Sequence, residues 1–268
     1  MVVKIQSDTF KNILRRVEKV EGALSLKDIR FLATAAANPT ADGDIVELGT
    51  FKGKSTALIA LAARLAPTCR FATVDPFPEG RRFEAEANLV QAGVRDEVEV
   101  FEMMSHEFTK TWRESIRLLF HDGANELNAI RQDIRELKPY FANGAIIAFH
   151  DVLNLTGHRC AAFAEDILAS DEFGAAGCCG GIGWAQFTTD PAVAQKNRRR
   201  RQKLRQKLER LVPFLRQAAV IGDQGNYRPS LLAKWRYKLA RARVPHRRVQ
   251  AHLWHTPQKH ENQESWAA

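Results

Sequence analysis

The chain has 268 residues, 45% of them hydrophobic, and a formal net charge of +9. This length suits one large α/β domain or a medium-sized domain with appendages, and the apolar content is typical of a globular protein with a sizeable core. No apolar run approaches the roughly 18 residues that a membrane span requires, and the N-terminal residues lack the apolar core of a signal peptide. We therefore expect no transmembrane segment.

The cysteines favour a reduced, cytoplasmic protein. The four cysteines form no CxxC pair, and Cys178 and Cys179 are adjacent. This spacing suits neither ordinary disulfide bonds nor a tetrahedral metal site.

Two helices are expected in residues 1–40. Apolar residues at helical spacing predict an amphipathic helix over residues 8–21. Ser25, followed three residues later by Asp28, predicts a capping box at the start of a second helix, which ends before Asn38.

Strands and helices then alternate over residues 41–190. Strands are expected at residues 44–49, 70–75, 97–102, 116–122 and 144–151, and helices at residues 54–65, 82–92, 126–141 and 157–168. The glycine-rich stretch 173–189 predicts an antiparallel hairpin that closes the edge of the sheet. Helices between successive strands favour an α/β fold with a mostly parallel sheet covered on both faces, which makes three layers.

Residues 191–268 are expected to form a basic helical extension. They contain 19 Lys and Arg against 4 Asp and Glu, whereas residues 1–190 have a net charge of −6. A basic helix is predicted over residues 194–217 and a second basic stretch over residues 228–248, and residues 258–268 are predicted to be disordered.

The basic extension admits two interpretations. Its charge could bind nucleic acid or an anionic membrane surface. Alternatively Leu204, Leu208 and Leu211, which recur at helical spacing, dock the helix on the body of the protein or on a second subunit of a homodimer.

The segment GTFKGKST at residues 49–56 is close to a phosphate-binding P-loop. A P-loop has four residues between its glycines, but three separate Gly49 from Gly53. Glu47 at the end of the preceding strand would also repel a triphosphate. Asp122 and Asp151, each after an apolar strand, keep a P-loop triphosphatase open as an alternative.

The pattern E-x-G-x-x-x-G that begins at Glu47 resembles the first motif of class I S-adenosylmethionine-dependent methyltransferases. The resemblance implies a Rossmann-like fold and a ligand that carries an ammonium and a sulfonium, for which an acidic strand end is favourable. It also implies that Gly49 and Gly53 let the backbone approach the ligand. Asp75, which ends the second strand, would bind the ribose hydroxyls, although it would suit the ribose of NAD equally well.

A second resemblance covers residues 40–190. Its ordered landmarks are Asp122-Gly123 after the fourth strand, Pro139, Asn143-Gly144, and His150-Asp151 at the end of the fifth strand. As a set they are similar to the branch that includes macrocin-type sugar O-methyltransferases. A histidine common in that branch shortly after Asp-Gly is replaced here by Asn125, so no role that depends on it is carried over.

These resemblances imply a cofactor site built at the strand ends, to which Asp122 also contributes. The residues around the methionine end would be Glu47, Gly49, Thr50, Phe51, Gly53 and Ser55. Asp75 would hold the ribose, with Pro76 and Phe77 beside it. Ser105 would contact the adenine edge, or alternatively lie at the start of a helix.

Asp122, His150 and Asp151 form the expected catalytic cluster, because all three follow strands whose ends meet at one edge of the sheet. Asp122 and Asp151 are candidate ligands for Mg²⁺, which prefers oxygen and would lower the pKa of a substrate hydroxyl. His150 is alternatively a general base. The two roles compete because consecutive side chains on a strand usually point to opposite faces. At the end of a strand the chain could already be turning, so the sequence leaves both roles open. A structural alternative is that Asp151 caps the next loop and His150 packs under it.

Together these features predict an S-adenosylmethionine-dependent methyltransferase that acts by in-line transfer to a hydroxyl of a small molecule or sugar. Two alternatives stay open. One is a non-catalytic protein that binds nucleic acid or a membrane surface through its basic tail, and the other is the P-loop triphosphatase.

Overall fold

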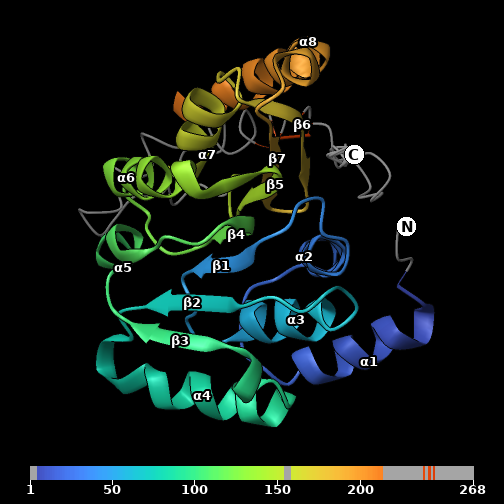
Figure 1. Ribbon diagram of the computed structural model, residues 1–268, viewed down its shortest axis with the longest axis vertical. Helices are drawn as coiled ribbons and strands as arrows, with labels where there is room; N and C mark the ends of the chain where they lie inside the picture. Colours follow the sequence, from blue (N-terminus) through green and yellow to red (C-terminus); the bar gives the residue numbers. More distant parts are fainter. Residues whose placement is uncertain (1–4, 154–157, 214–237, 239–240, 243, 245–268) are drawn as a thin grey trace, which may run out of the picture.

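A mostly parallel sheet of seven strands lies at the centre of the computed structural model, which describes residues 5–153, 158–213, 238, 241–242 and 244 (Figure 1). The strands are β1 (Asp44–Leu48), β2 (Phe71–Asp75), β3 (Glu99–Glu102), β4 (Ile116–His121), β5 (Phe141–Phe149), β6 (Phe173–Cys179) and β7 (Ile182–Phe187). Their order across the sheet is β3-β2-β1-β4-β5-β7-β6. The first five run parallel, and β7 runs antiparallel between β5 and β6. The predicted Rossmann-like α/β fold with a C-terminal antiparallel hairpin is confirmed.

Helices cover both faces of this sheet. On one side lie α1 (Ser7–Val17), α2 (Leu26–Ala37), α3 (Lys54–Ala63) and α4 (Arg81–Ala92); on the other lie α5 (Ser105–Thr111), α6 (Leu127–Leu137), α7 (Arg159–Ala162) and α8 (Pro191–Glu209). Alternating residues of the strands feed the two cores: Phe120 of β4 packs on the α3 side and Leu119 on the α6 side. Each strand therefore ends between two rigid layers.

The ends of several helices follow from local chemistry. The predicted capping box at Ser25 is present, since Ser25 N donates to Asp28 Oδ2 at 2.8 Å and Asp28 N donates to Ser25 Oγ at 3.3 Å. The predicted helix over 126–141 ends at Leu137 instead, because Pro139 disfavours helical backbone in the residue before it. A 3₁₀ turn over Lys138–Tyr140 then leads into β5.

Two further helices differ from the prediction. The helix α5 begins at Ser105, where a helix start was one of the two alternatives for this residue; its seven residues are too few to show a clear apolar period that would have bounded it. The helix expected over 157–168 begins at Arg159 and changes to a π-helix over Phe163–Ile167.

The basic helix α8 docks on the body of its own chain. It begins at Pro191, capped by Asp190, whose Oδ1 accepts a hydrogen bond from Ala192 N at 2.8 Å. Leu204, Leu208 and Leu211 are buried in the core on the α6 side, so the intramolecular alternative is the one observed. The predicted stretches 228–248 and 258–268 lie outside the described residues, apart from 238, 241–242 and 244.

No helix in the described part of the chain is both long enough and apolar enough to cross a membrane.

Candidate active site

A pocket of about 690 Å³ opens at the carboxyl ends of the parallel strands. The loop between α1 and α2 closes one side of it, from Glu21 to Leu24. Of the residues predicted to form the site, those that line the pocket are Gly49, Phe51, Ser55, Asp75, Pro76, Ser105, Asp122, His150 and Asp151. The other predicted residues do not line the pocket and are buried: Glu47, Thr50, Gly53 and Phe77. The topology thus brings most of the predicted residues into one cavity.

The glycines of the first turn serve the packing of the backbone. Gly49 has φ of 100°, and a Cβ built there would lie 2.6 Å from Asp122 C and from Gly123 N. Gly49 therefore permits the close contact between the ends of β1 and β4. Gly53 has φ of 82° and precedes α3 as its N-cap. The structure gives these glycines a structural reason that is independent of any ligand.

The carboxylate of Asp75 holds the first turn in place. Its Oδ2 accepts hydrogen bonds from Thr50 N at 3.1 Å and Phe51 N at 2.9 Å, and its Oδ1 accepts one from Phe77 N at 2.8 Å. A carboxylate offers about four acceptor positions, so about one is left. This remaining acceptor position is open to a ligand, and the predicted contact of Asp75 with the ribose hydroxyls stays a prediction.

Glu47 lies beneath the turn and is fully buried. Its Oε2 accepts hydrogen bonds from Thr56 Oγ1 at 2.5 Å and Thr73 Oγ1 at 2.7 Å. Burial raises the pKa of Glu47 to about 7, so at neutral pH this carboxyl is only partly ionised. The side chain points to the α3 layer because residues alternate along β1, and its predicted contact with a cationic ligand stays a prediction.

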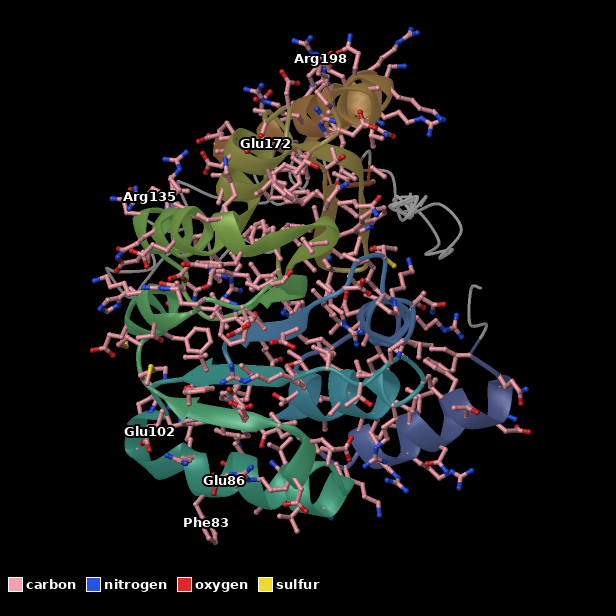
Figure 2. The ribbon with its side chains drawn as sticks, viewed as in Figure 1. Phe83, Glu86, Glu102, Arg135, Glu172 and Arg198 are labelled. Atoms are coloured by element: carbon pink, nitrogen blue, oxygen red, sulfur yellow. The ribbon has the colours of Figure 1, made fainter. Side chains whose placement is uncertain are left out.

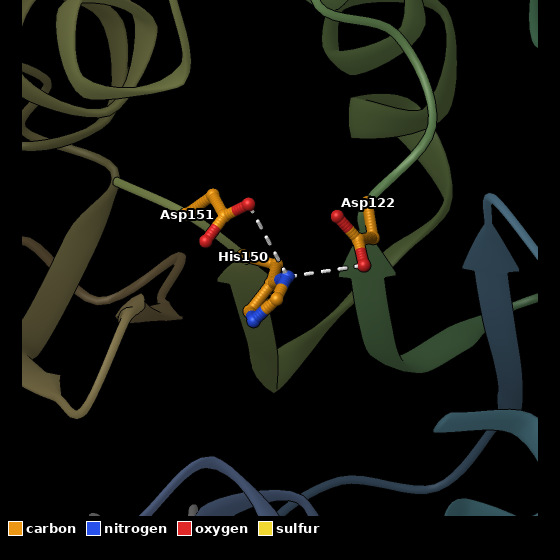
Figure 3. Close-up of side chains that lie close together, drawn as sticks. All are labelled: Asp122, His150 and Asp151. Atoms are coloured by element: carbon orange, nitrogen blue, oxygen red, sulfur yellow. Dashed lines mark ion pairs between the residues drawn. The ribbon is translucent and has the colours of Figure 1, made fainter. Parts of the chain in front are cut away.

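The cluster of Asp122, His150 and Asp151 forms at the ends of β4 and β5 (Figure 3). His150 Nδ1 lies 3.1 Å from Asp122 Oδ2 and 3.9 Å from Asp151 Oδ2. Asp151 has φ of 55°, a left-handed conformation that is uncommon outside glycine. This turn lets His150 and Asp151, although consecutive, both face the pocket, which removes the expected conflict between them.

His150 is surrounded by acids. The ring is 4% exposed, and its Nε2 lies 4.0 Å from Oδ2 of Asp28, the capping-box residue of α2. Burial by itself would lower the pKa of His150, but the hydrogen bond to Asp122 and the charges of Asp122, Asp151 and Asp28 outweigh it and raise the pKa above its ordinary value.

Arg159, the first residue of α7, was not among the predicted site residues. Its Nη1 pairs with Asp122 Oδ1 at 3.1 Å, and its Nη2 donates to the carbonyls of Asp122 and Gly123 at 2.8 and 3.0 Å. The Arg159 side chain is buried, with 5% of the residue exposed, and these contacts hold the loop after β4 in place. The sequence shows a cation here but gives no sign of its partner, which is 37 residues earlier in the chain.

Other wall residues were also missed, among them Lys54, Arg81 and Met104. Lys54 belongs to the segment GTFKGKST but not to the methyltransferase-like pattern that begins at Glu47, and Arg81 and Met104 belong to no motif. They reach the wall because α3, α4 and α5 all begin next to the pocket. The start of a helix after a parallel strand is the signal that would have found them.

Residues 46–152 match a family model described as a methyltransferase domain. The chain contains a methyltransferase domain. The matched segment begins in β1 and ends just after Asp151, so it spans the first turn and the acidic cluster. None of the curated protein sequences matches the chain.

The methyltransferase domain is similar in fold to solved structures. A candidate O-methyltransferase from Klebsiella pneumoniae is 19% identical, with 69% of this chain and 91% of that chain covered and a TM-score of 0.52. The O-methyltransferase from Bacillus cereus in complex with S-adenosylhomocysteine is 18% identical, with coverages of 68% and 92% and a TM-score of 0.50. A S-adenosylmethionine-dependent O-methyltransferase from Thermotoga maritima is 14% identical, with coverages of 68% and 72% and a TM-score of 0.50. At these identities the likeness establishes the fold.

The P-loop alternative finds no support in this domain. A phosphate would need the amides of the first turn, but Thr50 N and Phe51 N already donate to the carboxylate of Asp75. The carboxylate of Asp75 thus takes the position that the phosphates of the nucleotide occupy in a P-loop.

Proposed function

We propose that this methyltransferase moves the methyl group of S-adenosylmethionine to a hydroxyl oxygen of a small-molecule or sugar acceptor. The observation that carries the proposal is a buried histidine, His150, held by Asp122 on the wall of the domain's pocket. Oxygen must lose a proton as it accepts a methyl group, and an adjacent base is the group that O-methylation requires. The names of the Bacillus and Thermotoga neighbours agree with this chemistry.

The pocket fits the cofactor by size and by its donors and acceptors. About 690 Å³ lies within the range of roughly 300–1,000 Å³ typical of cofactor pockets. One acceptor position of Asp75 is free for a ribose hydroxyl. At the opposite end of the wall, Asp122 and Asp151 suit a cationic centre. Bound there, S-adenosylmethionine would supply a methyl group already activated by its sulfonium.

The chain's own part in the reaction is alignment and proton removal. The layers that hold β4 and β5 keep His150 in one orientation, and Arg159 fixes the carboxylate of Asp122 that faces it. Neutral His150 would take the proton of the acceptor hydroxyl, and Asp122 would stabilise the resulting imidazolium.

The same residues fit the predicted Mg²⁺ site poorly. One ligand atom from each of Asp122, His150 and Asp151 lies within 4.8 Å of the other two. However, the two oxygens of Asp122 already face Arg159 Nη1 and His150 Nδ1, each at 3.1 Å. A guanidinium beside the ligand repels a divalent cation, and Mg²⁺ prefers oxygen to the nitrogen of His150. We infer that Asp122 positions His150 instead of binding a metal.

Calorimetry with S-adenosylmethionine and S-adenosylhomocysteine tests the proposal first. Micromolar binding of both is expected, and no binding at millimolar concentration would contradict it. A transfer screen with methyl-labelled cofactor against pools of sugars and phenols would then identify the acceptor.

The exposed side of α8 is strongly basic and bears Lys196, Arg198, Arg199, Arg200 and Lys203 (Figure 2 labels Arg198). We propose that this side of α8 binds nucleic acid electrostatically. The leucines of α8, Leu204 and Leu208, are buried against the body, so they offer no apolar face for insertion into a membrane.

A further inference from the structure

Lys54 is a cation on the pocket wall that pairs with no carboxylate among the described residues. It is the first residue of α3 and is half-buried beside the α1–α2 loop. A Cβ placed on Gly22 would lie 3.0 Å from Lys54 Cβ and from Lys54 Cδ, so the stem of the lysine fills the space that Gly22 leaves open. The side chain therefore has a defined position.

The other cations near the pocket already have partners. Arg159 is bound to Asp122. Arg81 lies 3.6 Å from a carboxylate oxygen of Glu79, with its guanidinium 5.7 Å from the centre of the Phe51 ring.

Glu21, the acid nearest to Lys54 along the α1–α2 loop, is also engaged. It pairs with Lys52 at 2.6 Å, and Lys52 pairs in addition with Glu84 of α4 at 2.9 Å. Glu21, the only acid of the Glu21–Leu24 segment, therefore pairs with Lys52 and not with Lys54. The ammonium of Lys54 stays available to a ligand.

The position of Lys54 is unfavourable for the unliganded protein. A cation in the first turn of a helix faces the positive end of the helix dipole, which repels it. The first turn of α3 contains no acidic residue that would offset this repulsion. A bound anion would offset it.

We infer that Lys54 binds the carboxylate of the methionyl part of S-adenosylmethionine. This inference rests on the proposed function. The carboxylate is the cofactor's only anionic group, while the two ends of the pocket are acidic, with Asp75 at one and Asp122 and Asp151 at the other. Of the wall cations described, Lys54 is the one left to form a charge-assisted hydrogen bond with it.

Two ligands that differ in this carboxylate separate the role of Lys54 from general binding. S-adenosylhomocysteine carries the amino-acid end, and 5′-methylthioadenosine lacks it. In calorimetry, Lys54→Met should weaken S-adenosylhomocysteine about tenfold or more, because a hydrogen bond to a charged group is lost. Its affinity for 5′-methylthioadenosine should stay within about twofold of the parent value. Lys54→Arg should recover part of the loss.

Lys11→Met is the charge control, since it removes the same charge from the exposed side of α1 and Lys11 does not line the pocket. It should leave the ratio of the two affinities unchanged. The melting temperature of unliganded Lys54→Met should equal or exceed that of the parent, which shows that the variant is folded.

An unchanged affinity of Lys54→Met for S-adenosylhomocysteine would overturn the inference, and so would an equal loss for both ligands. If the parent protein binds neither ligand, the proposed function itself fails. The two failures are thus distinguishable.

Discussion

His150 Nδ1 lies 3.1 Å from Asp122 Oδ2, across the ends of two neighbouring parallel strands. The two residues are 28 positions apart, and the pairing of β4 with β5 brings them together. Because Asp122 is held on its other oxygen by Arg159, its charge is directed at His150. This relationship links the fold to the proposed proton transfer.

His150→Asn should lower kcat by roughly 10²–10⁴-fold, the usual contribution of a general base. Cofactor affinity should be unchanged, because the substitution removes the base and leaves the pocket wall in place. Steady-state kinetics and calorimetry together check this. A parallel loss of cofactor affinity would instead assign His150 to binding.

The pH dependence of kcat should report the charge of Asp122. A base acts in its neutral form, so kcat rises as the pH passes through the pKa of His150, which is raised above its ordinary value. Asp122→Asn removes the charge that raises this pKa, so the rise should move to lower pH. An unmoved profile at saturating cofactor would exclude His150 as the titrating group.

Chelation should leave activity unchanged, because the geometry of Asp122 fits a positioning role better than a metal site. Treatment with EDTA followed by assay, with and without added Mg²⁺, is the measurement. Loss of activity that Mg²⁺ or Mn²⁺ restores would contradict the assignment and return Asp122 and Asp151 to the role of metal ligands.

Glu47 should make the stability of the protein depend on pH. Its carboxyl has a pKa of about 7 when folded against 4.5 in the reference state, so the unfolded chain binds fewer protons between these values. The free energy of unfolding should therefore fall as the pH rises from about 4.5 to 7, by at most ~3 kcal/mol. Urea denaturation at several pH values should show a flatter curve for Glu47→Gln, and parallel curves would refute the cause.

Gly49→Ala should destabilise the protein by about 2–4 kcal/mol, because its Cβ would overlap the backbone of Asp122 and Gly123. Gly80→Ala is the matched control. Gly80 also has positive φ, of 75°, but nothing lies within 4 Å of its added Cβ. Gly80→Ala should therefore lower the free energy of unfolding by only ~1–2 kcal/mol, the cost of a left-handed conformation for alanine. If urea denaturation shows the same loss of unfolding free energy for both variants, the contact between β1 and β4 is not tight.

Replacing Arg199, Arg200 and Lys203 by Glu should weaken binding of a single-stranded oligonucleotide and reduce its salt dependence. The control replaces Lys11, Arg15 and Lys19 of the α1 region, which are equally exposed. Fluorescence anisotropy measures both. If both variants lose the same affinity for the oligonucleotide, the effect is one of net charge alone. A protein that binds anionic vesicles but not the oligonucleotide would instead have a membrane surface as its partner.

The fold could be predicted from the sequence because its signals are local. Apolar runs mark β1 to β5, the capping box marks α2, and acids at the strand ends mark the pocket. Directions of side chains could not be predicted in the same way. That His150 and Asp151 face together depends on one left-handed residue. That Arg159 faces Asp122 depends on packing between segments that are distant in the sequence.

Asp28 joins the earliest and the latest parts of the domain. Besides capping α2, its Oδ1 accepts a hydrogen bond from Gly181 N at 2.8 Å, in the turn between β6 and β7. Gly181 O in turn accepts a hydrogen bond from Val152 N at 3.0 Å, next to the cluster of Asp122, His150 and Asp151. During synthesis, the chain must therefore extend past residue 181 before the turn at His150 is secured. The domain gains its complete active site only when its last hairpin has been made, and a chain that stops short would carry every proposed catalytic residue without their final arrangement.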